Sequence, residues 1–306
     1  MWDFEHPPLD TFLAHRYRID RTSPSDCAAR LAAGTADIGL VPIAALAANP
    51  TLRILPGCTI ASKGRVRSLL LVRRAAQPLA ALRSVAADTA SRTTLAYARI
   101  LFHRWGNPTV PFLPLAADLD RMLEQADAAI LIGDPALLAL EERENRLART
   151  GEELNYHDLA EEWTTLTGLP FVSAVWGAAC SSTASKNVRV PQVRGPHGQV
   201  YVRGVEISNL RPGIKDAPAP ESPCPDSGTW DSIVHDFIQS RDHGLQNIDA
   251  LAAEWSTRLP IPEPTIRTYL TTNIHYILDD DCIAGMKAFF REAAALGILP
   301  NYEMRI

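Results

Sequence analysis

Two junctions between predicted strands and helices carry groups that could do chemistry. Ser91-Arg-Thr-Thr94 stands where a helix through residues 96–102 is predicted to begin, so hydroxyls and free backbone N–H groups meet at one helix N-terminus. Gly133 and Asp134 end the apolar run 126–134 and precede Pro135, which suits the first turn of the next helix. The first junction could bind an anion. The second could accept a proton, or Asp134 could simply cap the helix.

Alternating apolar runs and helical patterns would position these junctions. Predicted strands cover residues 36–42, 58–62, 66–72, 84–88, 126–134 and 171–176, and predicted helices cover 25–33, 96–102, 159–166, 230–238, 248–255, 263–278 and 282–295. Ser23 can cap the first helix, Pro24 suits its first turn, and Gly34 ends it. This order indicates an α/β fold with mixed, largely parallel sheets and a C-terminal helical layer.

Chain crossings near Val66 and Phe171 are expected to divide the chain into two lobes, with ligands bound between them at the carboxyl ends of strands. We expect lobe I to begin with residues 1–65, lobe II to cover 66–176, and helices within 230–306 to return to lobe I. Residues 177–229 are rich in Pro, Gly and Ser around a hairpin candidate at 199–203. This composition indicates an insertion or a flexible segment.

Composition narrows the function classes. The 306 residues are 46% apolar and 21% charged, which is typical of a folded globular protein. A formal charge of −5 argues against a general nucleic-acid binder. Five cysteines without CxxC spacing predict neither a disulfide framework nor a zinc site. Neither a signal peptide nor a membrane span is recognised, so a cytoplasmic location without membrane contact is expected.

Eight short motifs in order carry a family resemblance. They are Trp2-Asp-Phe-Glu-His6, Asp37-Ile-Gly-Leu-Val-Pro42, Ser62-Lys-Gly-Arg-Val-Arg-Ser68, Asp88-Thr-Ala-Ser-Arg-Thr-Thr94, Ile130-Leu-Ile-Gly-Asp-Pro135, Trp163-Thr-Thr-Leu-Thr-Gly-Leu-Pro-Phe171, Ser240-Arg-Asp-His-Gly-Leu245 and Asn273-Ile-His-Tyr-Ile-Leu278. With these motifs the chain resembles the chorismate dehydratases of the futalosine route to menaquinone. The resemblance implies a two-lobed, type II periplasmic-binding-protein-like fold. It also implies a hydro-lyase that converts chorismate to 3-enolpyruvylbenzoate without a metal or redox cofactor.

The same resemblance implies a clamp for a substrate carboxylate. One lobe would contribute Ser62, Gly64 and Ser68, and the other would contribute Ser91, Thr93 and Thr94, with Arg92 steering the dianion, Gly133 allowing close backbone approach and Trp176 forming a wall. Plainer roles stay open: a helix cap for Ser91, a turn for Ser62, and core packing for Trp176.

The family's catalytic asparagine has no counterpart here. Family members carry it in a loop that follows an N-terminal strand and precedes the Trp-Asp-Phe-Glu-His segment. This chain begins at that segment, so we expect either a truncated start or a damaged enzyme. Asp134 is then the candidate catalytic residue. His6, His243 and His275 are further acid or base candidates without metal-ligand spacing. Asp3 and Glu5 are expected near the site.

Two alternatives remain at this stage. One is the sister enzyme that acts later in the same pathway, a 1,4-dihydroxy-6-naphthoate synthase. The other is a small-anion-binding protein without turnover, because architecture alone does not establish chemistry.

Overall fold

The computed structural model describes residues 1–6, 16–87, 91–179, 190–191 and 227–306. The hairpin candidate at 199–203, Asp88, Cys180 and Cys224 lie outside these ranges, as does most of the predicted insertion at 177–229. Strands and helices alternate along the described residues, which confirms the α/β prediction.

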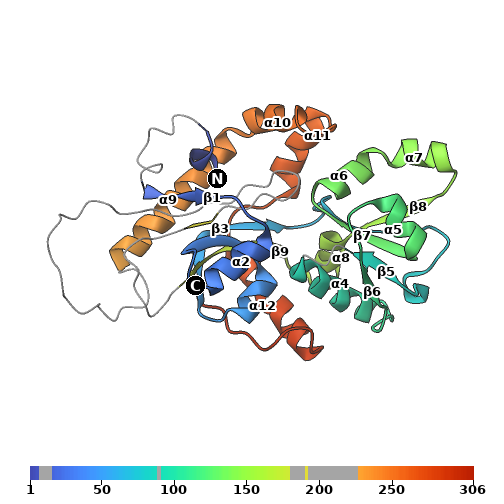
Figure 1. Ribbon diagram of the computed structural model, residues 1–306, viewed down its shortest axis with the longest axis horizontal. Helices are drawn as coiled ribbons and strands as arrows, with labels where there is room; N and C mark the ends of the chain where they lie inside the picture. Colours follow the sequence, from blue (N-terminus) through green and yellow to red (C-terminus); the bar gives the residue numbers. More distant parts are fainter. Residues whose placement is uncertain (7–15, 88–90, 180–189, 192–226) are drawn as a thin grey trace.

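A three-stranded sheet forms one half of the molecule (Figure 1). Its strands, in spatial order, are β2 (Ile38–Pro42), β9 (Phe171–Ala179) and β3 (Leu52–Ser62). β9 runs antiparallel to both neighbours and places Trp176 opposite Leu40. Helices that pack on β2 or β9 include α2 (Pro24–Ala32), α3 (Ile43–Ala48) and α12 (Asp280–Ala295). A short parallel pair, β1 (Ile19–Asp20) with β10 (Val190–Pro191), lies next to β2.

A five-stranded sheet forms the other half. Its spatial order is β6 (Phe112–Pro114), β5 (Val85–Ala87), β7 (Ala128–Ile132), β4 (Leu69–Arg74) and β8 (Leu154–Asp158). β5 is parallel to β6 and β7, whereas β4 is antiparallel to β7 and β8. Its helices are α4 (Arg92–Arg104), α5 (Leu119–Gln125), α6 (Asp134–Glu141), α7 (Arg143–Thr150) and α8 (Leu159–Thr167).

The chain passes between the sheets after β3 and again before β9, close to the predicted crossings near Val66 and Phe171. We keep the division into lobes at residues 65/66 and 176/177 as a proposal. Fewer strand pairs are parallel than expected. β9 and β4, the strands next to the crossings, are antiparallel to their neighbours.

An aromatic cluster joins the two halves. The Tyr97 ring in α4 lies 4.9 Å from Trp163 in α8, 4.1 Å from Phe171 in β9 and 4.3 Å from Phe289 in α12, measured between ring centroids. Its hydroxyl donates a hydrogen bond of 3.2 Å to the carbonyl of Val172. Helices that follow strands of the five-stranded sheet therefore share one core with the three-stranded sheet.

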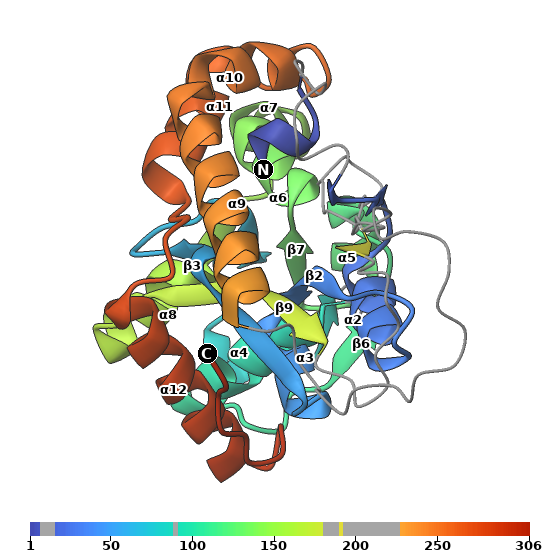
Figure 2. The same cartoon turned by 90° about the vertical axis from the view of Figure 1, so that its left-hand side faces the viewer.

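The last quarter is helical, as predicted. It consists of α9 (Ser227–Gln246), α10 (Ile248–Ser256), α11 (Glu263–Thr268), a π-helical turn η3 (Tyr269–Asn273) and α12. α9 rises along one side of the molecule toward α10, and the N-terminal turn η1 (Trp2–Phe4) lies beside it (Figure 2). Among the described residues, none of the helices has the length and apolar character needed to cross a membrane.

The predicted helix over 263–278 is wrong beyond Asn273. Residues 274–278 are not helical, and the backbone of His275 exchanges hydrogen bonds of 2.9 and 2.7 Å with Ala61 at the edge of β3. The apolar spacing of Ile274 and Leu278 suits either conformation, and pairing with β3 decides between them. Several elements were not predicted, among them α3, β6, α5, α7 and β8.

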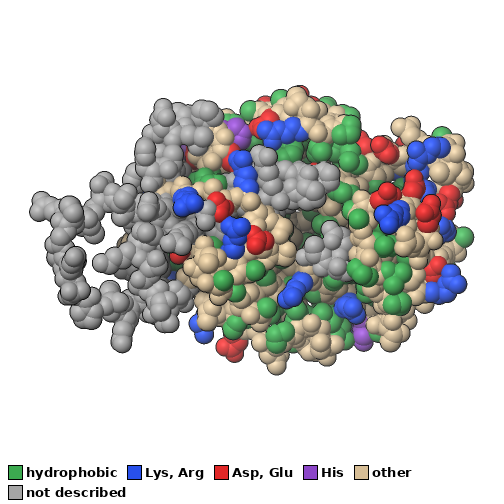
Figure 3. Space-filling view, in the orientation of Figure 1, with side chains coloured by type: hydrophobic (Ala, Val, Ile, Leu, Met, Phe, Trp, Pro, Cys, Tyr) green, Lys and Arg blue, Asp and Glu red, His purple; other side chains and the backbone are tan. Residues whose placement is uncertain are grey.

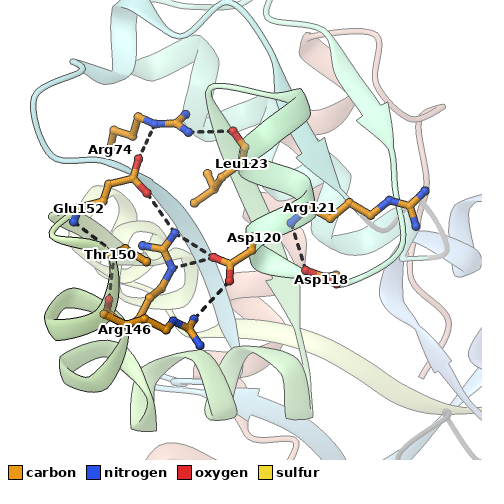
Figure 4. A network of polar contacts seen from close by, with 9 residues as sticks. Arg74, Asp118, Asp120, Arg121, Leu123, Arg146, Thr150 and Glu152 are labelled. Atoms are coloured by element: carbon orange, nitrogen blue, oxygen red, sulfur yellow. Dashed lines mark hydrogen bonds and ion pairs between the residues drawn. The ribbon is translucent and has the colours of Figure 1, made fainter.

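Ion pairs between arginines and carboxylates connect α7 to the five-stranded half of the molecule (Figure 4). Arg146 contacts Asp120 at 2.9 Å and Glu152 at 3.0 Å, and Glu152 also contacts Arg74 at 2.7 Å. Burial alone would raise the pKa of Glu152, but the hydrogen bonds from Arg146 and Arg74 outweigh it and the pKa is lowered. Acidic and basic side chains mingle on this end of the molecule (Figure 3), as expected of a solvated surface.

Candidate active site

A cavity of about 300 Å³ lies where the C-terminal helices meet both halves of the molecule. Its walls come from η1, β3, α6, α9, α10 and α11. The lining residues are mostly apolar and include Ile60, Leu137, Leu251, Trp255, Leu259, Ile266 and Leu270. A largely apolar concave site with a few polar groups is the usual form of a small-molecule pocket.

Several charged groups that line the cavity already have partners within the protein. His6 stacks on Trp2 at 3.9 Å between ring centroids, and its Nε2 lies 2.9 Å from Glu254. Arg258 also contacts Glu254, and Arg241 donates 2.5 Å to the carbonyl of Gly57. The cavity walls therefore contain cationic side chains that could release their present carboxylate or carbonyl partner and bind an anionic ligand instead.

Asp134 is the predicted site residue that lines this cavity. It is the first residue of α6, and the preceding Gly133 has a φ of +72°, a conformation that glycine adopts without steric cost. The backbone N–H of Gly133 donates 2.7 Å to the carbonyl of Ser68. Ser68 therefore lies next to Gly133 and Asp134, although it comes from a different part of the sequence.

Residues 62–68, which we call the 62–68 loop, connect the two sheets. Ser62 is 1% exposed, and its hydroxyl donates 2.9 Å to the carbonyl of Gly64 and accepts the Gly64 N–H at 3.3 Å. Arg67 has a φ of +66° and is the one non-glycine residue with positive φ in the part of the chain that the structure describes. Its N–H donates 2.5 Å to Asp158, the N-cap of α8.

The second predicted donor group lies at the N-terminus of α4. Ser91 caps this helix by accepting from the N–H of Thr94 at 3.4 Å, and its hydroxyl donates 2.9 Å to that of Thr94. Thr93 accepts 3.0 Å from the N–H of Ala44, so the first turns of α3 and α4 touch. Arg92 is exposed. The cap assignment of Ser91 is confirmed, whereas a substrate-binding role for 91–94 stays a prediction.

Trp176 lies in the core, 4% exposed, with its ring 4.8 Å from that of Phe237. Its predicted role as a cleft wall stays a prediction. Of the residues expected near the site, Glu5 and His6 line the cavity. Asp3 instead pairs with His243, whose Nδ1 lies 2.9 Å from the Asp3 carboxylate.

Tyr269 and Trp255 also line the cavity, and neither was predicted as a site residue. Neither stands in a recognisable motif, so the sequence carried no signal for them. Asn273 belongs to a quoted motif, yet its contact with the 62–68 loop could not be expected from the sequence.

Within the described residues, one cluster has side chains of the types that bind metal ions. Ligand atoms of His275, Asp279 and Cys282 lie within 4.8 Å of one another. Each already has a partner: Asp279 contacts Lys63 at 2.7 Å and His275 at 2.9 Å, and it caps α12 through the N–H of Cys282. Burial, followed by a hydrogen bond with Asp279, raises the pKa of the Cys282 thiol to about 12. The Lys63 ammonium would repel a cation, and a protonated thiol is a poor metal ligand.

Comparisons with known proteins agree with the fold and add the family. A family model described as menaquinone biosynthesis matches residues 3–192. A chorismate dehydratase from Thermus thermophilus is 26% identical over 300 residues, which cover 95% of this chain and 91% of that protein.

Solved structures share the fold at low identity. A protein from Archaeoglobus fulgidus has a TM-score of 0.53 at 15% identity, covering 94% of this chain and 99% of its own. The periplasmic aliphatic sulphonate binding protein SsuA from Escherichia coli has a TM-score of 0.51 at 14% identity, covering 92% and 83%. These likenesses confirm a periplasmic-binding-protein-like fold, and the family match shows that the chain belongs to the menaquinone biosynthesis family.

Proposed function

We propose that this chain is a chorismate dehydratase, a carbon–oxygen lyase of the futalosine route to menaquinone. The observation that carries the proposal is the cavity, in a chain of this family. It places Asp134 of α6 beside apolar side chains of β3 and of the C-terminal helices. The similarity to the Thermus thermophilus chorismate dehydratase extends over most of both chains and supports this choice of substrate.

The reaction breaks one ring C–H bond and the C–O bond of the ring hydroxyl. The electrons of the C–H bond complete the aromatic ring, a protein group takes the proton, and hydroxide leaves as water after protonation. Aromatisation supplies driving force, so the protein has mainly to orient the dianion and stabilise developing charge. Such steps require no redox partner.

Residues of the site divide these tasks in our proposal. The ring would rest against apolar walls such as Trp255 and Leu259, and Asp134 would act as proton acceptor. The donors Ser62, Gly64 and Ser68, together with Ser91, Thr93 and Thr94 and with Arg92 nearby, would hold a carboxylate. Chorismate is the only partner that this proposal requires.

The decisive experiment incubates the purified protein with chorismate and follows 3-enolpyruvylbenzoate by chromatography. Asp134→Asn should lower kcat/KM by about 100-fold or more, because a positioned proton acceptor contributes that much. Asp280→Asn, an exposed aspartate at the start of α12, is the matched control and should leave it unchanged. Saturable chorismate binding without product would overturn the proposal in favour of an anion-binding protein.

A further inference from the structure

The π-helical turn η3 contacts the 62–68 loop through two side chains. The hydroxyl of Tyr269, at the start of the turn, donates 3.1 Å to the Ser68 hydroxyl. The side-chain amide of Asn273, at its end, donates 2.9 Å to the carbonyl of Arg65. Residues four apart lie on one face of a helical turn, so a single turn reaches the loop at two points. Single π-helical turns occur frequently at functional sites.

The loop needs such support because its conformation is strained. Arg67 adopts the left-handed conformation, which is unfavourable for a residue other than glycine. A strained residue persists only where its surroundings fix it. Asp158 holds Arg67 by its N–H, and Gly133 holds Ser68 by its carbonyl at 2.7 Å. Tyr269 and Asn273 complete the set from the C-terminal helices.

Asn273 is buried, and Tyr269 is partly buried. Asn273 is 8% exposed. Burial raises the pKa of the Tyr269 hydroxyl to about 12, so at neutral pH the hydroxyl stays protonated and can donate its hydrogen to Ser68. Tyr269 also lines the cavity beside Asp134. One side chain therefore contacts both the cavity and the loop.

The direction of the Tyr269 bond has a chemical consequence. Because the Ser68 oxygen accepts from Tyr269, the hydrogen of the Ser68 hydroxyl is left for another acceptor. A hydroxyl that accepts one hydrogen bond becomes a stronger donor, since successive hydrogen bonds polarise one another. A carboxylate is the acceptor that would gain most from such a donor.

We propose that Tyr269 and Asn273 are positioning residues that hold the 62–68 loop and turn Ser68 into a donor for a substrate carboxylate. The carboxylate part rests on the proposed function, whereas the loop-holding part stands on the contacts alone. Neither residue needs to touch the reacting atoms, so the loss should fall on substrate affinity more than on the chemical step.

The test compares Tyr269→Phe with Tyr156→Phe, which removes a hydroxyl from β8 on the five-stranded sheet. Hydrogen exchange of the loop amides, followed by mass spectrometry, should be about fivefold or more faster in Tyr269→Phe than in the control. KM for chorismate should rise about tenfold, while kcat changes far less. Asn273→Ser provides a second variant with the same expected direction if Tyr269→Phe folds poorly.

Each result decides something. Loop exchange equal to that of the control would overturn the positioning role, whatever the activity. Faster exchange with an unchanged KM would overturn the carboxylate role of Ser68. If the unsubstituted protein neither binds nor dehydrates chorismate, the proposed function fails, and the exchange data alone then decide whether η3 holds the loop.

Discussion

At the scale of single residues, one buried carboxylate connects two segments that lie 44 residues apart in the sequence. Asp127, just before β7, accepts from the N–H of Arg83 at 2.8 Å, from its Nε at 3.0 Å and from its guanidinium NH2 at 2.9 Å. These hydrogen bonds from Arg83 lower the pKa of Asp127. The Arg83 side chain is 84% exposed, so water screens much of the ion pair, and the backbone bond matters most.

Asp127→Asn should therefore lower the free energy of unfolding by about 1 to 2 kcal/mol at pH 7. The pKa is lower in the folded state than its unfolded value near 3.9, so the contribution is complete above that value and is lost as the pH falls through the folded pKa. Urea unfolding at pH 7, 5, 3 and 2 should show the difference from the unsubstituted protein shrinking below about pH 4. A constant difference down to pH 2 would contradict the charge-dependent part.

At the scale of elements, close backbone approach sets how α12 packs. A Cβ built on Gly285 would lie 2.4 Å from the carbonyl oxygen of Pro170, in the connection between α8 and β9. Neither partner is the flexible end of a side chain, so an added methyl group must move a backbone. This glycine therefore allows α12 to lie against the start of β9.

Gly285→Ala is expected to lower the free energy of unfolding by about 1 to 3 kcal/mol through this overpacking. Gly244→Ala in α9 is the matched control, because its Cβ would make an ordinary contact of 3.7 Å with Trp2. That control should gain about 0.5 to 1 kcal/mol from helix propensity. Urea unfolding of both variants measures the difference, and equal effects at the two positions would argue against the packing explanation.

At the scale of the whole molecule, the C-terminal helices connect the two sheets around the cavity. The cluster of Leu137, Ala252, Ile261 and Ile266 packs α6 of the five-stranded half against α10 and α11. A ligand in this cavity would touch both halves at once. Its binding would therefore stabilise the arrangement of the halves as well as each half separately.

Chorismate should raise the urea concentration at the midpoint of unfolding. At 100 times its Kd, a ligand that binds only the folded state adds about 2.7 kcal/mol. Benzoate, with one carboxylate in place of two, is the control ligand and should give a smaller shift at equal concentration. A midpoint that does not move with chorismate would contradict binding at this cavity.

Local chemistry was readable from the sequence. Ser23 and Pro24 begin α2, and Ser23 accepts from the N–H of Asp26 as a cap should. Ser91 caps α4, and Gly168 ends α8 in the left-handed conformation. Such signals involve partners within a few residues, so a single sequence contains both sides of each interaction. The same holds for the buried runs that became β2, β7 and β9.

The tertiary structure decided the rest. Tyr269 meets Ser68 and Asn273 meets Arg65 across about two hundred positions of chain, and no local pattern records which distant groups will pair. Residues 274–278 follow β3 because the edge of a sheet offers them backbone partners that a helix would have to replace. The sequence by itself determined the family, the alternation of elements and the helix caps. Only packing determined which of the predicted groups meet at the cavity, because side chains distant in sequence acquire a common environment only when the sheets and helices enclose it.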